Sequence, residues 1–410
     1  MTIHRFLIAG ALALGPFAAQ ADGRIAVEAA HDLDAARPAE TIAVSWSDVS
    51  RMLPGALMHH IAVKDAAGRI LPCQVISASP DARDAEGKGT AYGDLVFQYD
   101  FAAGERTATF TIEKTAGVSP PFAPRVFARY VPERLDDFAW ENDKVAHRTY
   151  GPALAAPDTA GTGKEVLVTS GLDVWFKHVD YPIVDRWYAK GSAHYHKDEG
   201  EGLDMYGVGT SRGAGGTGVW DGKRLYTSRN YVGWKVIANG PIRAIFELTY
   251  APWDAAGVQV AEVKRFTVDA GHEFDSVEST FVFSGPTRLR VALGLNRRPA
   301  YDERSPVVKT DRLPAQHALA QWVTQHSDGD FGVAVILPSA VWDGYAQDPA
   351  NDLILANVQS GKPLRYLVGA APAWSADVHD ARDWQRRIAA EASRLAAPVR
   401  ITLHPLDVNE

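Results

Sequence analysis

The sequence predicts a mainly β protein with a small N-terminal sandwich, a larger body of long strands and one C-terminal helix. Short alternating stretches such as residues 107–112 recur between turn signals across residues 22–125, which is typical of a small sandwich. Longer alternating runs such as residues 242–250 follow in residues 126–410, and runs of this length indicate large sheets. A helix is expected over residues 381–395, where apolar side chains recur at helical spacing.

The first residues carry the features of a secretory signal peptide. Arg5 precedes a short apolar run over residues 6–19, and a small-x-small cleavage sequence ends at Ala21. We expect cleavage after Ala21, which removes residues 1–21, and export to the periplasm or the medium. The apolar run is too short to cross a bilayer and no later run is long enough, so no membrane span is predicted. Cys73, the only cysteine, is expected to be buried and inert.

The composition limits the class of partner. The chain has 410 residues and a net charge of -8, which argues against nucleic-acid binding because that needs a basic surface. The 11 Trp, 14 Tyr and 15 Phe can stack on sugar rings, which fits an oligosaccharide partner, although core packing explains them equally well. The sequence holds no internal repeat and no heptads, and it carries no prediction of oligomeric state.

A first group of polar residues lies in residues 136–152. If residues 144–150 form a strand, residues 145, 147 and 149 share one face, so His147 and Arg148 point to opposite sides. The alternative is a solvated edge strand with ion pairs. The candidate site residues from this segment are Trp140, Glu141, Asn142, His147, Arg148 and Tyr150.

A second group begins at His194. On an extended strand, His194, His196 and Asp198 face the same way. Such a triplet can bind a divalent metal through imidazole and carboxylate groups, can supply a general base, or can form a surface histidine pair. Nothing else in the sequence requires a cofactor.

Closely spaced glycines then separate Glu201, Asp204, Tyr206 and Arg212, which predicts a loop whose backbone can approach a ligand. The glycine run at residues 213–218 lacks the Gly-Lys-Ser/Thr ending of a phosphate loop, so nucleotide binding is not expected. No Gly-x-Ser-x-Gly elbow nominates a serine nucleophile.

Aromatic residues precede the histidine pair. Trp187 either forms a sugar platform with Tyr188 or packs a sheet, whereas packing is favoured for Trp175. Lys235, in the strand expected over residues 232–238, is included as a substrate-binding cation.

Several unusual sequence segments resemble segments of the bacterial exported proteins grouped as domain of unknown function 4861, and the resemblance covers nearly the whole mature chain. They lie at residues 138–144, 150–154, 200–204, 211–213, 215–220, 237–243 and 247–250. The family is similar to proteins encoded among polysaccharide-degrading enzymes. The resemblance implies a supersandwich fold related to aldose mutarotases and polysaccharide lyases, and chemistry on uronic-acid sugars that includes β-elimination. It implies no role for any individual residue.

β-Elimination needs a group that neutralises the uronate carboxylate, a base for the adjacent ring proton and an acid for the leaving oxygen. We expect Arg212 or Arg148 to bind the carboxylate, and His196 or His194 to act as base. Tyr206 or Tyr150 is the expected acid. The expected catalytic residues are His147, His194, His196, Tyr206 and Arg212, and the expected substrate-binding residues are Trp140, Glu141, Asn142, Arg148, Tyr150, Trp187, Glu201, Asp204 and Lys235.

Two other functions fit the same residues. A glycoside hydrolase would use paired carboxylates from Glu141, Asp143, Glu201 and Asp204. A non-catalytic periplasmic sugar-binding or scaffold protein would use the aromatic and polar loops without turnover.

Overall fold

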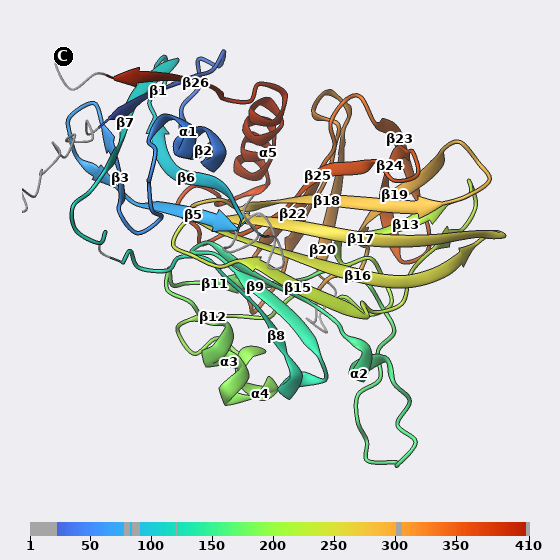
Figure 1. Ribbon diagram of the computed structural model, residues 1–410. Coiled ribbons are helices and arrows are strands. Elements are labelled where there is room, and N and C mark those ends of the chain that lie inside the picture. The colour runs from blue at the N-terminus through green and yellow to red at the C-terminus, as the bar shows by residue number, and fades with distance from the viewer. Residues whose placement is uncertain (1–22, 78–82, 84–90, 120, 301–305, 407–410) are drawn as a thin grey trace, which may run out of the picture.

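A computed structural model describes residues 23–77, 83, 91–119, 121–300 and 306–406. It confirms a mainly β protein with several antiparallel sheets and a C-terminal helix (Figure 1). The predicted signal peptide lies outside the described residues. No helix among those residues is long and apolar enough to cross a membrane.

A small sandwich forms the first part. Its two sheets have the strand orders β26-β1-β7-β3-β4 and β2-β6-β5. Apolar side chains from both sheets, such as Val27 and Phe97, form a separate core. The elements are β1 (Arg24–Ala30), β2 (Arg37–Ser45), α1 (Trp46–Met52), β3 (Ile61–Asp65), β4 (Ile70–Leu71), β5 (Cys73–Ser77), β6 (Tyr92–Phe101) and β7 (Thr107–Lys114). Cys73 is half-buried rather than buried, and burial raises its pKa to about 11, which disfavours the reactive thiolate.

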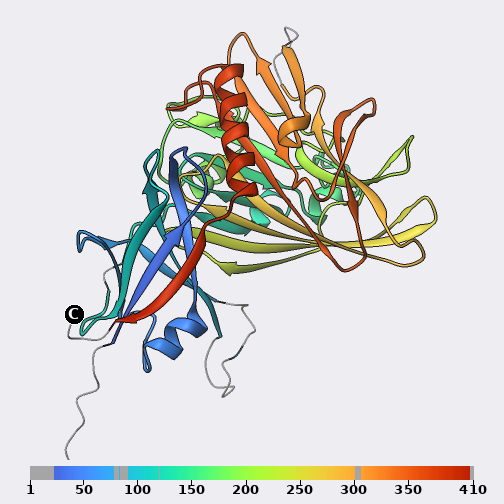
Figure 2. The same ribbon diagram turned by 90° about the horizontal axis from the view of Figure 1, so that it is seen from above.

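The last strand of the chain lies in this first sandwich. Strand β26 (Arg400–Leu406) pairs antiparallel with β1, so the two ends of the described chain lie side by side (Figures 1 and 2). Ile401 and Leu403 alternate toward the sandwich core, which explains why this strand covers the edge of β1. The expected division had left these residues in the second part, so the first sandwich is built from residues at both ends of the sequence.

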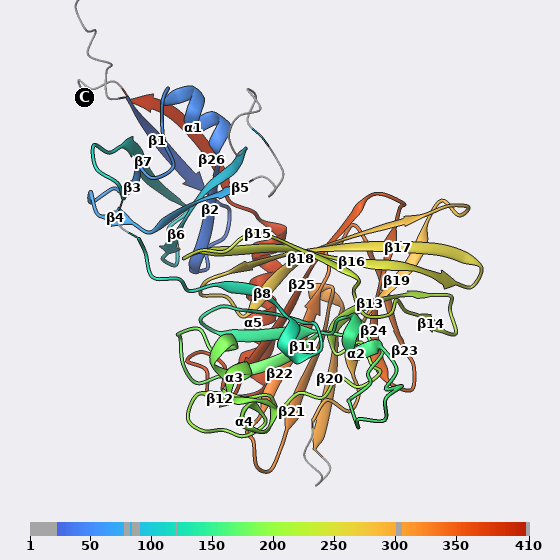
Figure 3. The same ribbon diagram turned by 60° about the horizontal axis from the view of Figure 1, so that its bottom comes forward.

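The second part is a larger two-layer sandwich. An eight-stranded sheet, β15-β16-β17-β18-β25-β22-β21-β20, forms one layer. Two five-stranded sheets, β12-β11-β10-β9-β8 and β14-β13-β19-β24-β23, face it across a common core (Figure 3). Phe138 and Trp140 on β9 pack there against Phe246 and Phe266 of the eight-stranded sheet.

The strands of these sheets are longest in the eight-stranded layer, as expected from the sequence. That layer contains β15 (Gly233–Ala238), β16 (Arg243–Ala255), β17 (Val258–Asp269), β18 (Phe274–Phe283), β20 (Val307–Leu313), β21 (Ala318–Thr324), β22 (Phe331–Ile336) and β25 (Pro363–Pro372). The facing sheets contain β8 (Phe127–Val131), β9 (Asp137–Glu141), β10 (Val145–Thr149), β11 (Asp173–Lys177), β12 (Gly202–Leu203), β13 (Ala214–Trp220), β14 (Leu225–Tyr226), β19 (Leu289–Asn296), β23 (Trp342–Gln347) and β24 (Asn351–Val358).

Helices cover the outer faces of the second part. Helix α5 (Ala381–Ala396) packs Trp384 and Ile388 on the eight-stranded sheet, and Asp380 caps its first turn. Helices α3 (Val184–Lys190) and α4 (Ser192–Tyr195) cover the β8–β12 sheet (Figure 3). The remaining short helices are η1 (Pro132–Arg134), α2 (Pro152–Ala155) and η2 (Pro314–Gln316).

The β8–β12 sheet has one face toward the common core and one toward α3 and α4. On β10, Val145 and His147 point into the core, whereas Ala146 and Arg148 point outward. The opposite orientation of His147 and Arg148 was predicted from the alternation of this strand and is confirmed. The outer face therefore carries a different set of polar side chains from the inner face.

Candidate functional site

Arg148 is the centre of a buried polar group between the β8–β12 sheet and the helices α3 and α4. Its Nε donates to Oδ2 of Asp173 at 2.6 Å, and its Nη2 donates to Oδ2 of Asp204 at 2.9 Å. Its Nη1 donates to the Tyr195 hydroxyl at 3.2 Å. Arg148 and Asp173 are direct partners on adjacent strands, so the sheet register brings this ion pair together. We call this group, with the residues described next, the Arg148 cluster.

Asp137 adds a third carboxyl to the Arg148 cluster. Its Oδ2 lies 3.7 Å from Nη1 of Arg148 and accepts a hydrogen bond from the Tyr188 hydroxyl at 3.1 Å. Burial raises the pKa of Asp137 to about 6, against the opposing effect of the Arg148 charge. The Tyr150 hydroxyl donates to Oδ2 of Asp173 at 3.1 Å, so two phenols and one guanidinium hold the carboxyls in place.

The charged groups of the Arg148 cluster shift one another's pKa values. Burial raises the pKa of Asp173 and of Asp204, and the charge of Asp173 raises that of Asp204 further. Burial alone would lower the pKa of Arg148, but the Asp173 carboxylate and its neighbours raise it, so the guanidinium stays charged. A permanent cation thus holds two carboxyls that bind protons more readily than exposed ones do.

His196 connects the Arg148 cluster to the surface. Its side chain is 40% exposed, and Nδ1 lies 3.2 Å from the Asp204 carbonyl oxygen and 3.5 Å from Oδ2 of Asp204. A carbonyl oxygen can only accept, so Nδ1 carries the proton and Nε2 carries the lone pair of the neutral ring. Burial, aided by the charges of Arg148 and Arg134, lowers the pKa of His196. The ring is therefore neutral at neutral pH and has the form that a general base requires.

Arg134, at the end of η1, is a second cationic group of the Arg148 cluster with access to solvent. Its side chain is 19% exposed, and Nη2 donates to Oε2 of Glu165 at 2.6 Å. Its Nη1 is a buried atom with no hydrogen-bond partner within the part of the chain that the structure describes, so this nitrogen does not face solvent. Arg134 acts electrostatically on Asp137 and on His196, so it belongs to the same local field.

Four residues of the predicted site, Arg148, Tyr150, His196 and Asp204, meet in the Arg148 cluster. The structure does not support a clamp role for Arg148, because carboxyls of the chain already occupy its donors and it is only 3% exposed. Nor does it support Tyr150 as the acid, because the buried phenol donates to Asp173.

The extended arrangement of His194, His196 and Asp198, for which metal binding was one of three alternatives, does not form. Residues 192–195 form a helical turn rather than a strand, because Gly191 (φ 88°) ends α3 and reverses the chain into α4. His194 pairs with Glu199 at 2.7 Å, and Asp198 pairs with His178 at 3.0 Å, so the three side chains have different partners. Among the residues that the structure describes, no group of three or more His, Cys, Asp or Glu side chains is arranged to hold a metal ion.

His147 and Trp140 lie on the inner face of the sheet, away from the Arg148 cluster. The two rings stack at 5.3 Å, and the Trp140 indole donates to Oδ2 of Asp275 at 2.7 Å. His147 Nδ1 lies 3.1 Å from the Asp173 carbonyl oxygen, and burial lowers the pKa of His147 to about 4. Neither side chain reaches solvent, so neither can take the role in catalysis or substrate binding that was expected for it.

Arg212 and Tyr206 are also enclosed in the core. Arg212 donates to the hydroxyls of Ser170 and Thr169 at 2.8 and 3.2 Å, and burial lowers its pKa to about 10. Tyr206 packs against Phe331, and its buried hydroxyl has no hydrogen-bond partner among the described residues. Neither residue can contact a substrate at His196, which contradicts the expected clamp and acid.

The other expected substrate-binding residues hold the fold together. Glu141 accepts from Lys177 Nζ at 2.7 Å and from the main-chain N–H groups of Ile183 and Val184, which anchors the start of α3. The Asn142 amide donates to the carbonyl oxygens of residues 269 and 272, both at 2.8 Å. These contacts join the β8–β12 sheet to its surroundings and leave neither side chain facing a ligand.

Trp187, Glu201 and Lys235 likewise lie outside the rim of the cluster. Trp187 is fully buried against Trp175, and its indole donates to Oε2 of Glu201 at 3.2 Å. Packing is thus the observed role of Trp187, and the sugar-platform alternative does not hold. Lys235 lies on β15 opposite Glu247, in the other layer of the sandwich.

Four side chains of the cluster were not singled out from the sequence: Arg134, Asp137, Asp173 and Tyr195. Asp137 could have been placed on the outer face by counting alternate positions back from Glu141 on β9. Asp173 could not have been placed beside Arg148 from the sequence, because their contact depends on the pairing of two strands and the two residues are 25 positions apart.

Comparison with known proteins gives the family. Two solved chains, an alpha-mannosidase and a glycosyl hydrolase family 38 protein from Enterococcus faecalis, match with TM-scores of 0.44 and 0.45 at 8% and 9% identity. The matches cover 94% and 95% of this chain but 46% and 48% of those chains, so the chain spans less than half their length, and this similarity carries no conclusion about activity. "Uncharacterized protein P7" of Formosa agariphila is 31% identical over 413 residues, covering 98% of this chain and 99% of that protein. The family model described as "Domain of unknown function (DUF4861)" matches residues 30–401, and the chain belongs to this family.

Proposed function

We propose that the protein is an exported carbohydrate-active enzyme that acts on uronic-acid-containing oligosaccharides by β-elimination, with His196 as the base. The observation that carries this proposal is the His196 ring, which the Asp204 carbonyl fixes in one tautomer at the rim of the buried Arg148 cluster, near Arg134. The site combines a neutral base with the guanidinium of Arg134, whose side chain is 19% exposed and would have to exchange its contact with Glu165 for the substrate carboxylate. That pair is what abstraction of a proton next to a carboxylate requires.

In the proposed step, Arg134 binds the uronate carboxylate and makes the proton on the neighbouring ring carbon more acidic. His196 Nε2 takes this proton, and the electrons of the C–H bond form a ring double bond. The C–O bond on the next carbon then breaks, and the His196 imidazolium passes the same proton to the leaving oxygen. The products are an unsaturated uronate and an alcohol, or water where a hydroxyl leaves, so the reaction balances without a further reactant.

The remaining members of the Arg148 cluster would position the base. Asp204 orients His196, and Arg148 fixes Asp204 while its own position is fixed by Asp173. Such a rigid second layer keeps the imidazole in its reactive orientation, as buried carboxylates do in other histidine bases. The Tyr150 and Tyr195 phenols are buried and hydrogen-bonded within the cluster, so they position rather than donate a proton to substrate.

The resemblance to proteins encoded among polysaccharide-degrading enzymes supports an oligosaccharide substrate, and the signal-like first 21 residues support export to the periplasm or the medium. The hydrolase alternative is less favoured, because Asp204 is buried and held by Arg148 and the other three expected carboxylates are engaged apart from one another. Glu141 anchors α3, Asp143 accepts from the Gly271 N–H, and Glu201 accepts from Tyr181.

The test is an assay of the mature chain with oligosaccharides that carry glucuronate, iduronate or galacturonate at the non-reducing end. β-Elimination gives the ultraviolet absorbance of an unsaturated uronate, and mass spectrometry distinguishes loss of water from release of a glycosyl group. Activity should fall as the pH drops through the lowered pKa of His196, because the base works only when neutral. Cleavage without the chromophore would establish hydrolysis instead, and no turnover of any uronate would overturn the proposal.

A further inference from the structure

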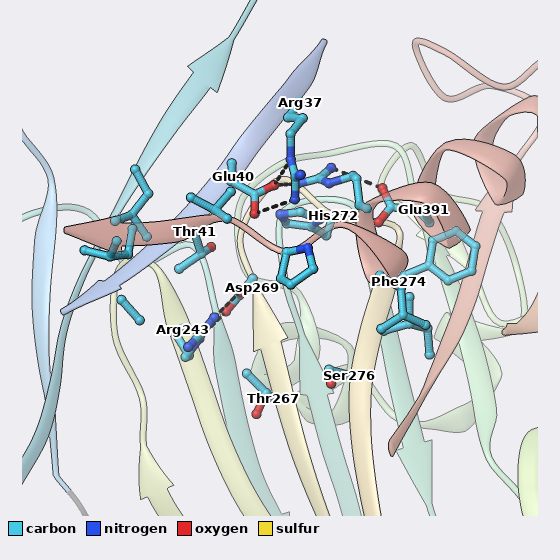
Figure 4. A pocket seen from close by; sticks show the side chains of 18 residues that line it. Arg37, Glu40, Thr41, Arg243, Thr267, Asp269, His272, Phe274, Ser276 and Glu391 are labelled. Atoms are coloured by element: carbon cyan, nitrogen blue, oxygen red, sulfur yellow. Dashed lines mark hydrogen bonds and ion pairs between the residues drawn. The ribbon is translucent and has the colours of Figure 1, made fainter. Parts of the chain in front are cut away.

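A cavity of about 510 Å³ lies where the two parts of the molecule meet (Figure 4). Its walls come from β2 of the first sandwich, from the outer face of the eight-stranded sheet, and from α5 with the segment that leads to β26. It lies on the opposite layer from the Arg148 cluster and shares no residue with it. Its volume is in the range of sites for small molecules, which often lie at domain interfaces.

The charged groups that line the cavity neutralise one another. Glu40 accepts from Arg37 at 3.0 Å and from Arg394 at 2.7 Å, and the Arg243 guanidinium binds both carboxylate oxygens of Asp269 at 2.6 Å. These guanidiniums outweigh burial and keep the pKa values of Glu40 and Asp269 below their ordinary values, so both carboxylates are ionised. Glu391 provides a third carboxylate, bound to Arg394 at 3.2 Å.

The pairing of the charged side chains in the cavity favours an uncharged ligand. Three guanidiniums and three carboxylates line the cavity, and each is engaged with a member of the opposite set. An anion would have to displace a carboxylate from its arginine, and a cation would have to displace an arginine from its carboxylate. A ligand with hydroxyl groups can share the paired charges without displacing any of them, because a hydroxyl both donates and accepts.

The floor of the cavity offers unengaged hydroxyl groups. Thr267 on β17 and Ser276 on β18 are direct cross-strand partners, and both line the cavity (Figure 4). Neither hydroxyl has a hydrogen-bond partner within the described ranges of the chain. His272 Nε2 donates to the Ala39 carbonyl oxygen at 2.8 Å, so its Nδ1 is left as an acceptor. Donors and acceptors thus converge on one space from three elements.

The other walls are apolar. Ile42, Leu367, Leu395 and Ile401 line the cavity, and Phe274 stacks on Trp384 at its edge. Sugars combine apolar C–H faces with hydroxyl edges, which matches apolar walls over a polar floor. We propose that this interdomain cavity binds a neutral saccharide unit of one or two sugar rings, at a site separate from the Arg148 cluster.

The experiment measures binding of cellobiose, lactose and xylobiose to the mature protein by calorimetry and saturation-transfer NMR, with glucuronate as the charged comparison. At least one neutral disaccharide should bind, and glucuronate should bind more weakly. The variant Thr267→Val with Ser276→Ala should weaken binding about tenfold, because two hydrogen bonds are lost without a change of shape. Thr249→Val is the matched control, because Thr249 lies on β16, is exposed and does not line the cavity.

His196→Gln should leave disaccharide binding unchanged, so failure of the proposed function and failure of this site are separate results. If the double variant unfolds, Ser276→Ala alone tests the same floor, with an expected loss of a few fold. No binding of any of the three disaccharides would overturn the proposal. Equal binding by the double variant and the wild type would also overturn it.

Discussion

The polar residues on the two faces of the β8–β12 sheet have different surroundings. On the inner face, burial lowers the pKa of His147 to about 4, and across the core, on β18 of the opposite layer, burial raises the pKa of Asp275 to about 7; Oδ2 of Asp275 lies 3.6 Å from Nε2 of His147. On the outer face, Arg148 stays charged because carboxyls surround it, and the cluster reaches solvent at His196. Adjacent residues of one strand are thus separated: His147 is enclosed in the core, whereas Arg148 belongs to a cluster that reaches solvent.

The largest expected effect comes from the residue that opens the outer face to solvent. His196→Gln should lower the rate of β-elimination by about 10²–10⁴-fold, the usual contribution of a general base, with little change in melting temperature. His194→Gln is the control, because His194 lies two residues away on α4 and pairs with Glu199. The rate of product formation under saturating substrate measures both. An equal loss in both variants, or none in either, would remove His196 as the base.

Arg148→Met should be the most destabilising change on the outer face. It leaves Asp173 and Asp204 buried without their cation, and breaking a buried ion pair in this way costs about 3–5 kcal/mol. Arg129→Met on β8 is the matched control, because Arg129 is 25% exposed and its ion pairs contribute about 1 kcal/mol at most. Denaturant unfolding measures the free energy of unfolding of each. Similar losses would show that the cluster is not the stabilising centre of this face.

Across the core from the inner face, Asp275 on β18 accepts a hydrogen bond from Trp140, and Asp275→Asn should change how stability depends on pH. The folded-state pKa of Asp275 is raised by burial from 3.8 to about 7, so the proton is held in the folded protein after the unfolded chain has lost it. The favourable contribution of wild-type Asp275 is therefore complete below about pH 4 and lost as the pH rises toward 7. The loss is on the order of 4 kcal/mol at most.

Thermal unfolding of both proteins from pH 4 to pH 8 checks this expectation. The stability of Asp275→Asn relative to wild type should rise across that interval and level off above it. The buried amide of the variant has a constant cost that shifts the curve without changing its slope. Parallel curves would mean that Asp275 titrates at its ordinary pKa and that water reaches its carboxyl group.

The sequence predicted only part of the difference between the two faces of the β8–β12 sheet. The alternation of residues 145–149 placed His147 and Arg148 on opposite sides, because a strand has a period of two. It could not say which side faced the core, since both faces of this sheet are covered, one by the opposite layer and the other by α3 and α4. The catalytic expectation for His147 failed for this reason.

Other features depended on contacts between distant parts of the chain. The Arg148 cluster forms because β11 pairs with β10 and because the loop before Asp204 returns under α4. The helical turn at residues 192–195 replaced an expected strand because Gly191 can adopt a positive φ, which periodicity does not reveal. The pairing of β26 with β1 joins the two ends of the described chain, and its alternation alone does not name a partner.

The smallest expected effect distinguishes the proposed reaction from hydrolysis. Glu201 accepts hydrogen bonds from Tyr181, Arg186 and Trp187 at the edge of the outer face, so Glu201→Gln should cost about 1 kcal/mol of stability or less. The rate of β-elimination should change less than about threefold, because no contact joins Glu201 to the Arg148 cluster among the described residues. A hydrolase that used Glu201 as one of its paired carboxylates would instead lose nearly all activity. Steady-state rates of the variant, measured beside His196→Gln, therefore decide which of the two residues takes part in the chemistry.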